Sequence, residues 1–365
     1  MSEIPNIADV FIVGGGPAGL AAAIAARRQG LTVILADGAK SNIDKACGEG
    51  LMPQALKTLA ELGVSIDLKD GHPFRGIHFV EAGYSAAAEF SDGIGLGVRR
   101  TRLHTVLAEA AGEAGVTLLW QSPVTSFGSS SVVCSGRTIH YKYLIGADGH
   151  SSEVRKNFGL GATLHESSRF GFRRHYNAVP WSDCVEVYWG NGCQIYITPV
   201  GRNEVGVAVL SDDSHLRLDQ ALRQFPQLQQ RLLHSNLTSS ERGAISASRR
   251  LRRVATERVA LIGDASGSVD AITGDGLSQA FQQAEALAAA MNANDLTSYQ
   301  TAHNQIRRRP ALLAQILLSL GRHELLRRLS FRFLAQYPFV FSQILSLHTT
   351  GMLQTTNFSP IRQTQ

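Results

Sequence analysis

The stretch VFIVGGGPAGLAAAIAARRQGLTVILAD (Val10–Asp37) decides the fold of this chain. An apolar run, residues 10–13, meets three consecutive glycines, and an alanine-rich segment follows. A second apolar run, residues 32–35, leads to an acid. This order predicts a strand, a tight turn, a helix and a second strand.

The glycines of this unit have separate physical tasks. Gly14 lets the chain turn sharply off the strand, Gly16 leaves room for a pyrophosphate beside the backbone, and Gly19 lets the helix pack closely on the sheet. The helix directs its unpaired N–H groups and its positive dipole end at the phosphates. Asp37 ends the second strand, where an acid accepts hydrogen bonds from ribose hydroxyls. We therefore expect a dinucleotide site; the alternative is a glycine-rich turn without a ligand.

Composition places the chain among ordinary enzymes. Its 365 residues, 44% of them hydrophobic, suffice for two domains or one large one. The cysteines form no CxxC pair, which argues against a disulfide scaffold, a zinc site or an iron–sulfur cluster. The histidines show no metal-binding spacing, so we expect no metal. Few cysteines and no basic leader predict a cytoplasmic protein. The cysteines are Cys47, Cys134, Cys184 and Cys193.

Positive charge is concentrated near the C-terminus. Residues 301–365 carry a net charge of +7 and the first 300 residues carry −2, so a nucleic-acid binder is not expected. One helical stripe there contains Leu325, Leu326, Leu329 and Phe333, with Arg327, Arg328 and Arg332 outside it. We expect this stripe to dock on the protein's own catalytic domain; the alternative is peripheral contact with a membrane surface or a lipid-like substrate.

The remaining pattern alternates between helix and sheet. Helices are predicted at 54–63, Thr101–Ala114 and 215–235, a meander at 122–147, and further sheet at 71–98 and 166–211. A basic strand-like patch covers Ser246–Thr256, and the remainder beyond residue 276 is mostly helical.

Two further strands end in glycine and an acid. Residues 143–145 lead into GADG (Gly146–Gly149), and residues 259–262 lead into GDA (Gly263–Ala265). Ligands of parallel sheets collect at such carboxyl ends. The loop Gly274-Asp275-Gly276 then opens a helix whose N-terminal amides could hold an anion or a polarised carbonyl.

These three motifs, in this order, resemble the flavoprotein hydroxylase superfamily with the p-hydroxybenzoate hydroxylase-like fold, over roughly residues 8–300. The resemblance implies an α/β fold: a Rossmann-type FAD-binding domain (1–70, 95–165 and 246–300), an inserted β-sheet substrate domain (71–94 and 166–245) and a helical C-terminal region (301–365). It also implies FAD as cofactor and NAD(P)H as reductant.

The resemblance assigns the cofactor residues one by one. The ADP part of FAD would lie on Gly14, Gly16, Pro17, Ala18, Gly19 and Asp37. Arg100 would contact the pyrophosphate, Val124 the adenine, and Lys45 would either reach the phosphates or stay exposed. Asp148 and Gly149 would touch both FAD and the reductant, Asp264 the ribityl or pyrophosphate, and Gly274, Gly276 and Leu277 the flavin ring.

Departures from the hydroxylase pattern indicate a branch. Many aromatic hydroxylases have His, Pro, Gln and Asn where this chain has Gly267, Ala271, Asp275 and Ser278. The TGDGL segment, together with KACGEGL after the first unit, is similar to the geranylgeranyl reductase branch, which contains reductases and hydroxylases. No W-x-W-x-I-P motif is present, which argues against a tryptophan-type halogenase.

Candidates for the chemistry are few. Cys47 is either a proton donor or pocket wall, or a buried apolar residue. Glu49, Asp270 and Asp275 are candidates for proton transfer, against the alternative of solvated loop acids, and Ser266 shares this status. An aromatic wall or ordinary core packing would account for Trp181, Tyr188, Trp189 and Tyr196, while His104 and His140 are expected at the surface or as caps.

The sequence therefore favours an FAD-dependent monooxygenase of secondary metabolism. It would hydroxylate an apolar small molecule, aromatic or polyketide-like, with NAD(P)H and O₂. The second hypothesis is a reductase of an isoprenoid double bond. The third is a flavin-binding redox partner without catalysis of its own.

Overall fold

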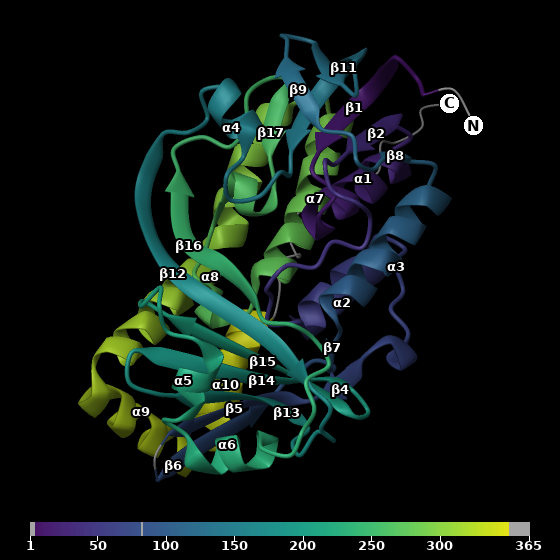
Figure 1. Cartoon of the computed structure of the whole chain (residues 1–365). Helices are drawn as coiled ribbons and strands as arrows, with labels where there is room; N and C mark the ends of the chain where they lie inside the picture. Colours follow the sequence, from purple (N-terminus) through teal and green to yellow (C-terminus); the bar gives the residue numbers. More distant parts are fainter. Residues whose placement is uncertain (1–3, 82, 350–365) are drawn as a thin grey trace, which may run out of the picture.

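Three sheets organise the chain in the computed structural model, which describes residues 4–81 and 83–349 (Figure 1). A seven-stranded sheet and an eight-stranded sheet lie at opposite ends of the molecule, and helices flank both (Figure 1). A small three-stranded sheet is formed by β3 (Gly50–Leu51), β7 (Gly95–Gly97) and β4 (His72–Phe74).

The seven-stranded sheet contains the predicted β-α-β unit. Its parallel strands pair so that Ile12 lies opposite both Leu35 and Ile145, which brings their carboxyl ends to one edge. Across the sheet the order is β8 (Thr117–Leu119), β2 (Val33–Ala36), β1 (Ile7–Val13), β11 (Arg137–Gly146), β10 (Ser131–Cys134) and β9 (Val124–Phe127), and β17 (Val259–Leu261) also pairs with β11.

Three helices cover this sheet. All the alanines of α1 (Pro17–Arg28) except Ala18 are buried, so their small side chains let α1 pack against both α3 (Arg100–Glu113) and α7 (Gly276–Asn292). The predicted helix at 101–114 therefore forms within one residue. Shorter helices lie at α2 (Pro53–Glu61) and α4 (Glu153–Asn157).

The eight-stranded sheet is antiparallel except where β13 pairs in parallel with β5. Its long strands β12 and β16 reach up toward the seven-stranded sheet (Figure 1). Where the sequence predicted one helical stretch at 215–235, two short helices form, α5 (Leu218–Leu222) and α6 (Pro226–Leu232). In spatial order the strands are β18 (Gly267–Ser268), β16 (Arg242–Leu251), β12 (Thr163–Tyr176), β15 (Glu204–Ser211), β14 (Cys193–Gly201), β13 (Cys184–Trp189), β5 (Gly76–Glu81) and β6 (Tyr84–Glu89).

The C-terminal helices α8 (Tyr299–Arg322), α9 (Glu324–Gln336) and α10 (Pro338–Thr349) close one side of this sheet (Figure 1). An aromatic cluster joins them to it: the ring of Phe79 stacks on Phe331 at 5.3 Å between centroids and lies 4.9 Å from Phe341. None of the helices among the described residues is long and apolar enough to cross a membrane.

One expectation about α9 is wrong. The sequence favoured burial of the stripe Leu325, Leu326, Leu329 and Phe333 against the catalytic domain. All four side chains are exposed, and Arg327 is buried instead. The reason is a long-range partner, since Arg327 forms an ion pair with Glu81 of β5 at 2.8 Å.

Candidate functional site

A cavity of about 850 Å³ lies at the carboxyl edge of the seven-stranded sheet and extends to α10. It contains both the glycine turn at Gly16 and the apolar side chain of Leu345. Of the predicted site residues, those lining it are Gly14, Gly16, Pro17, Ala18, Asp37, Lys45, Cys47, Glu49, Arg100, Val124, Asp148, Gly149, Asp264, Gly274, Gly276 and Leu277.

The glycine turn has the close contacts that its sequence predicts. A Cβ on Gly14 would lie 2.3 Å from the carbonyl oxygen of Ala147, and one on Gly19 would lie 1.9 Å from that of Gly14. At Gly16 a Cβ would meet nothing within 4 Å, so this backbone faces the cavity. Gly19 itself does not line the cavity, which agrees with its role in helix packing.

Asp37 organises the same turn. Its carboxylate accepts hydrogen bonds from the backbone N–H groups of Gly15, at 2.6 Å, and Ala39, at 2.7 Å. The acid therefore stands at the end of β2, beside the turn, as the ribose-binding hypothesis requires.

His104 is not a surface residue, contrary to our expectation. It is fully buried in α3, where its Nδ1 accepts from the backbone N–H of Asn42 at 3.2 Å. Its Nε2 must then carry the proton and donate to the carbonyl of Gly15 at 2.9 Å. Burial lowers the pKa of His104, so the ring is neutral and anchors the glycine turn. The sequence signal for this burial is that His104 lies on the same helix face as Leu107 and Ala111. The other expected surface histidine, His140, is exposed.

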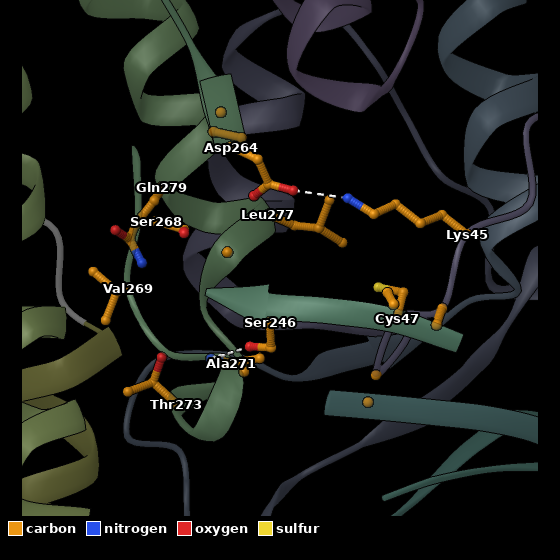
Figure 2. A pocket seen from close by; sticks show the side chains of 18 of the residues that line it. Lys45, Cys47, Ser246, Asp264, Ser268, Val269, Ala271, Thr273, Leu277 and Gln279 are labelled. Carbon is orange, nitrogen blue, oxygen red and sulfur yellow. Dashed lines mark hydrogen bonds and ion pairs between the residues drawn. The ribbon is translucent and has the colours of Figure 1, made fainter. Parts of the chain in front are cut away.

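Lys45 and Asp264 face each other across the cavity (Figure 2). Lys45 Nζ and Asp264 Oδ2 are 2.8 Å apart, with side chains 44% and 48% exposed. Partial burial tends to raise the pKa of the Asp264 carboxyl, but the charge and hydrogen bond of Lys45, with smaller effects of Arg100 and His150, outweigh it, so that pKa lies below its ordinary value. The pair stays ionised and presents both charges to a bound ligand.

Several features of the cavity fit FAD. Arg100 Nε and Asp148 Oδ1 are buried without a hydrogen-bond partner among the residues described, which provides one donor and one acceptor. Neither Gly149 nor Gly276 has an atom within 4 Å of the position where a Cβ would stand. Exposed backbone at a helix N-terminus, a guanidinium and a carboxylate suit the phosphates and hydroxyls of a dinucleotide.

Glu49 is the centre of a buried polar cluster that sequence patterns did not reveal. One carboxylate oxygen accepts from the backbone N–H of Arg100 at 2.7 Å, and the other lies 2.5 Å from His175 Nε2. His175 Nδ1 is 2.7 Å from Ser239 Oγ, and Arg173 Nη2 is 3.8 Å from Glu49. Glu49 adopts the left-handed conformation, with φ of 59°. The cluster therefore ties the start of α3 to β12.

The other candidate acids have structural partners. Asp270 accepts from the backbone N–H of Ile272 at 3.0 Å and pairs with Arg169 Nη1 at 3.1 Å. Neither Asp270 nor Asp275 lines the cavity, although both are buried. Ser266 is also outside the lining and donates to the carbonyl of Gly263 at 2.8 Å.

The four aromatic residues predicted as a possible wall do not share one face of the cavity. Of these four, only Tyr196 lines the cavity, and its hydroxyl donates to the carbonyl of Ile272 at 3.0 Å. Trp181 and Tyr188 instead donate to Glu186, and Trp189 is buried against Phe331. Core packing thus accounts for three of the four.

Comparisons with known proteins agree with this geometry. A family model described as an FAD binding domain matches residues 7–298. A menaquinone reductase of Mycolicibacterium smegmatis is 29% identical over 81% of this chain and 79% of its own length. A digeranylgeranylglycerophospholipid reductase of Methanococcoides burtonii is 27% identical over 74% of this chain and 71% of its own. The hispidin-3-hydroxylase of Neonothopanus nambi is 29% identical, over 52% of this chain and 49% of its own.

Solved structures show the same fold. A flavin-dependent brominase has a TM-score of 0.76 at 18% identity, over 94% of this chain and 99% of that one. A geranylgeranyl bacteriochlorophyll reductase-like protein of Thermoplasma acidophilum has a TM-score of 0.73 at 21% identity, over 86% and 88%.

Proposed function

This chain belongs to the FAD-binding family of oxidoreductases with the p-hydroxybenzoate hydroxylase-like fold, and from that premise we propose that it reduces a carbon–carbon double bond in an isoprenoid lipid. The single observation that carries the proposal is the shape of the cavity. It continues from the glycine turn at Gly16 to the apolar side chains of Leu317, Phe341 and Leu345.

The lining of the far end favours a long apolar substrate. Beyond the cofactor residues the walls are side chains of the eight-stranded sheet and of α8–α10, most of them apolar. Binding sites of about 300–1,000 Å³ commonly enclose one ligand, and here a dinucleotide and a substrate would share about 850 Å³. A long, flexible apolar substrate would fit the space left beside the dinucleotide better than a compact polycyclic molecule. These walls include Phe79, Tyr196, Leu313, Leu317, Leu334 and Phe341.

The relatives support the same choice. The sequence alone favoured hydroxylation, but the two reductases above match about three quarters or more of this chain, whereas the hydroxylase matches about half. The names of these two reductases refer to a prenylated quinone and a prenylated glycerolipid. The shared chemistry is an isoprenoid chain.

Different residues of the cavity bind the cofactor and orient the substrate. FAD, once bound and reduced, would supply a hydride, which is two electrons and one proton, to the double bond. Arg100, Asp148 and the Lys45–Asp264 pair hold the dinucleotide, and the apolar walls orient the alkene and exclude water. The second hydrogen must arrive as a proton.

We assign that proton to Cys47. Its side chain stands on the same wall as Lys45 (Figure 2), and it lines the cavity. The backbone N–H of Glu49 donates to its Sγ at 3.4 Å. That N–H group would face the sulfur as its proton moves to carbon.

Oxygen dependence tests the proposal. Enzyme that has been reduced chemically under argon should oxidise when a prenylglycerol is added, and the product should gain two hydrogen atoms by mass spectrometry. The saturated analogue should leave the flavin reduced. Cys47→Ser should slow this step while FAD stays bound.

Hydroxylation with NAD(P)H and O₂ is the second candidate, which the hydroxylase match favours. A product that gains one oxygen atom, and forms only in air, would establish it and exclude the reductase.

A further inference from the structure

The orientation of α9 is fixed by its buried side. Arg327 donates to Glu81 Oε1 from Nη2 at 2.8 Å and from Nε at 3.0 Å, and to the carbonyl of Leu320 at 3.1 Å. Phe331, one turn away, is buried against Phe79 and Trp189. Because Arg327 and Phe331 occupy the buried side of α9, its apolar stripe lies on the exposed side.

That stripe is part of a larger apolar surface. Leu325 is 79% exposed and Leu329 is 66% exposed. Half of the large apolar side chains exposed in the described part of the chain lie between residues 312 and 344. Because α8, α9 and α10 contact one another, we call this region the α8–α10 surface. It contains Leu312, Ile316, Leu325, Leu326, Leu329, Phe333, Tyr337, Phe339 and Ile344.

Arginines are exposed on the same helices as this surface, and one of them, Arg328, pairs with Glu324 at 2.5 Å. Arg308, Arg309, Arg322, Arg328 and Arg332 are exposed on α8 and α9. Glu324 is the one acid of residues 301–365. A helix with an apolar stripe beside arginines is typical of proteins that lie in the interface of an anionic bilayer.

The cavity opens on the same surface. Ile316 of α8 and Ile344 of α10 both line the cavity, and they are 50% and 42% exposed. Leu317, Phe341 and Leu345 continue the lining inward. The mouth of the cavity therefore lies among the exposed apolar side chains.

We propose that the α8–α10 surface docks on an anionic lipid bilayer, so that the cavity mouth opens into the acyl region. A second copy of the chain fits less well, because two such surfaces would bring their arginines together. Docking stands on the apolar side chains and the charge. The inference rests on the proposed function only for the molecule that passes through the mouth.

Vesicle co-sedimentation of the FAD-loaded full chain tests docking. Vesicles of phosphatidylglycerol and phosphatidylcholine should bind the protein, and phosphatidylcholine alone should bind it at least tenfold more weakly. The triple variant Leu325→Gln, Leu329→Gln, Phe333→Gln should lose at least tenfold in affinity. The matched control is Val179→Gln, Leu233→Gln, Leu237→Gln, which changes three exposed apolar residues elsewhere and should bind like wild type.

The charges are tested separately. Arg322→Gln with Arg332→Gln should reduce the difference between the two kinds of vesicle. Wild-type protein that stays in the supernatant with both, or a triple variant that binds normally, would overturn the proposal. Light scattering that shows a dimer abolished by the triple variant, without vesicle binding, would assign the surface to a second copy.

The two proposals fail separately. Vesicle binding without any double-bond reduction would remove the proposed function and leave docking in place. If the protein reduced a short prenyl alcohol dissolved in water at a normal rate but did not bind vesicles, docking would be excluded and the proposed function would stand.

Discussion

In the glycine turn, one glycine is required by the packing of the fold and another by the bound ligand. Gly16 and Gly19 belong to the same motif, but only Gly19 packs against the backbone of its own chain. A side chain at Gly16 would enter the cavity, whereas one at Gly19 would push α1 off the turn. The sequence motif alone does not distinguish the two demands.

Substitution at these glycines should therefore have opposite signatures. Gly16→Val should raise the dissociation constant for FAD at least tenfold and leave the stability of the cofactor-free chain nearly unchanged, because its φ of −70° suits any residue. Gly19→Val should lower the free energy of unfolding by about 2 kcal/mol or more through overpacking. Flavin titration and urea denaturation measure the two effects, and equal destabilisation by both would contradict this account.

Glu49 carries a second prediction at this scale. Glu49→Ala would leave the N–H of Arg100 and Nε2 of His175 without their acceptor, which should cost about 2 kcal/mol. FAD binding should weaken as well, because Arg100 begins α3 and lines the cavity. Glu49→Gln keeps the acceptor for Arg100 and is the matched control. If the two variants had the same unfolding free energy and FAD affinity, the cluster would have no positioning role.

Among the elements, α9 shows where a local pattern misleads. Its apolar stripe has the spacing of a core-facing helix, yet a buried ion pair 246 residues apart in sequence turns the other face inward. Short-range spacing predicted the three glycine-and-acid strand ends correctly, since each is a local turn with a local cause. It missed Arg169, Arg173 and Arg327 because their acidic partners lie on distant elements.

Removing Arg327 should detach α9. Arg327→Met would leave the carboxylate of Glu81 buried without its close partner, at a cost of about 3–5 kcal/mol. The double variant Arg327→Met, Glu81→Leu removes both charges and should recover most of this loss. Urea denaturation measures the free energies, and Arg332→Met, on the exposed side, should stay within about 0.5 kcal/mol of wild type. A double variant no more stable than Arg327→Met would show that the ion pair is not the cause.

At the scale of the whole molecule, His303 of α8 joins the C-terminal helices to the turn Gly263–Ser266 that follows β17. Its Nε2 lies 3.0 Å from Ser266 Oγ. Because the Ser266 hydroxyl already donates to Gly263, the imidazole must be the donor, and its Nδ1 has no partner among the described residues. Protonation would therefore place a charge on a buried nitrogen with no acceptor.

This arrangement predicts how the stability of the whole chain depends on pH. Burial, with a smaller effect of Arg307, lowers the pKa of His303 from 6.5 to about 3. Between these values the unfolded chain binds a proton that the folded chain does not, so stability is complete above pH 6.5 and falls as the pH decreases, by at most about 1.4 kcal/mol per pH unit. Below about pH 3 this contribution levels off. His104, also buried, acts in the same direction.

Urea denaturation between pH 7.5 and pH 5 measures this loss of stability. The decline should be shallower for His303→Gln, which keeps a donor for Ser266, than for wild type. His140→Gln, at an exposed position, should keep the wild-type slope. Identical slopes for all three proteins would mean that His303 takes up its proton in the folded state, and that α8 is not held to the turn Gly263–Ser266 by a neutral ring.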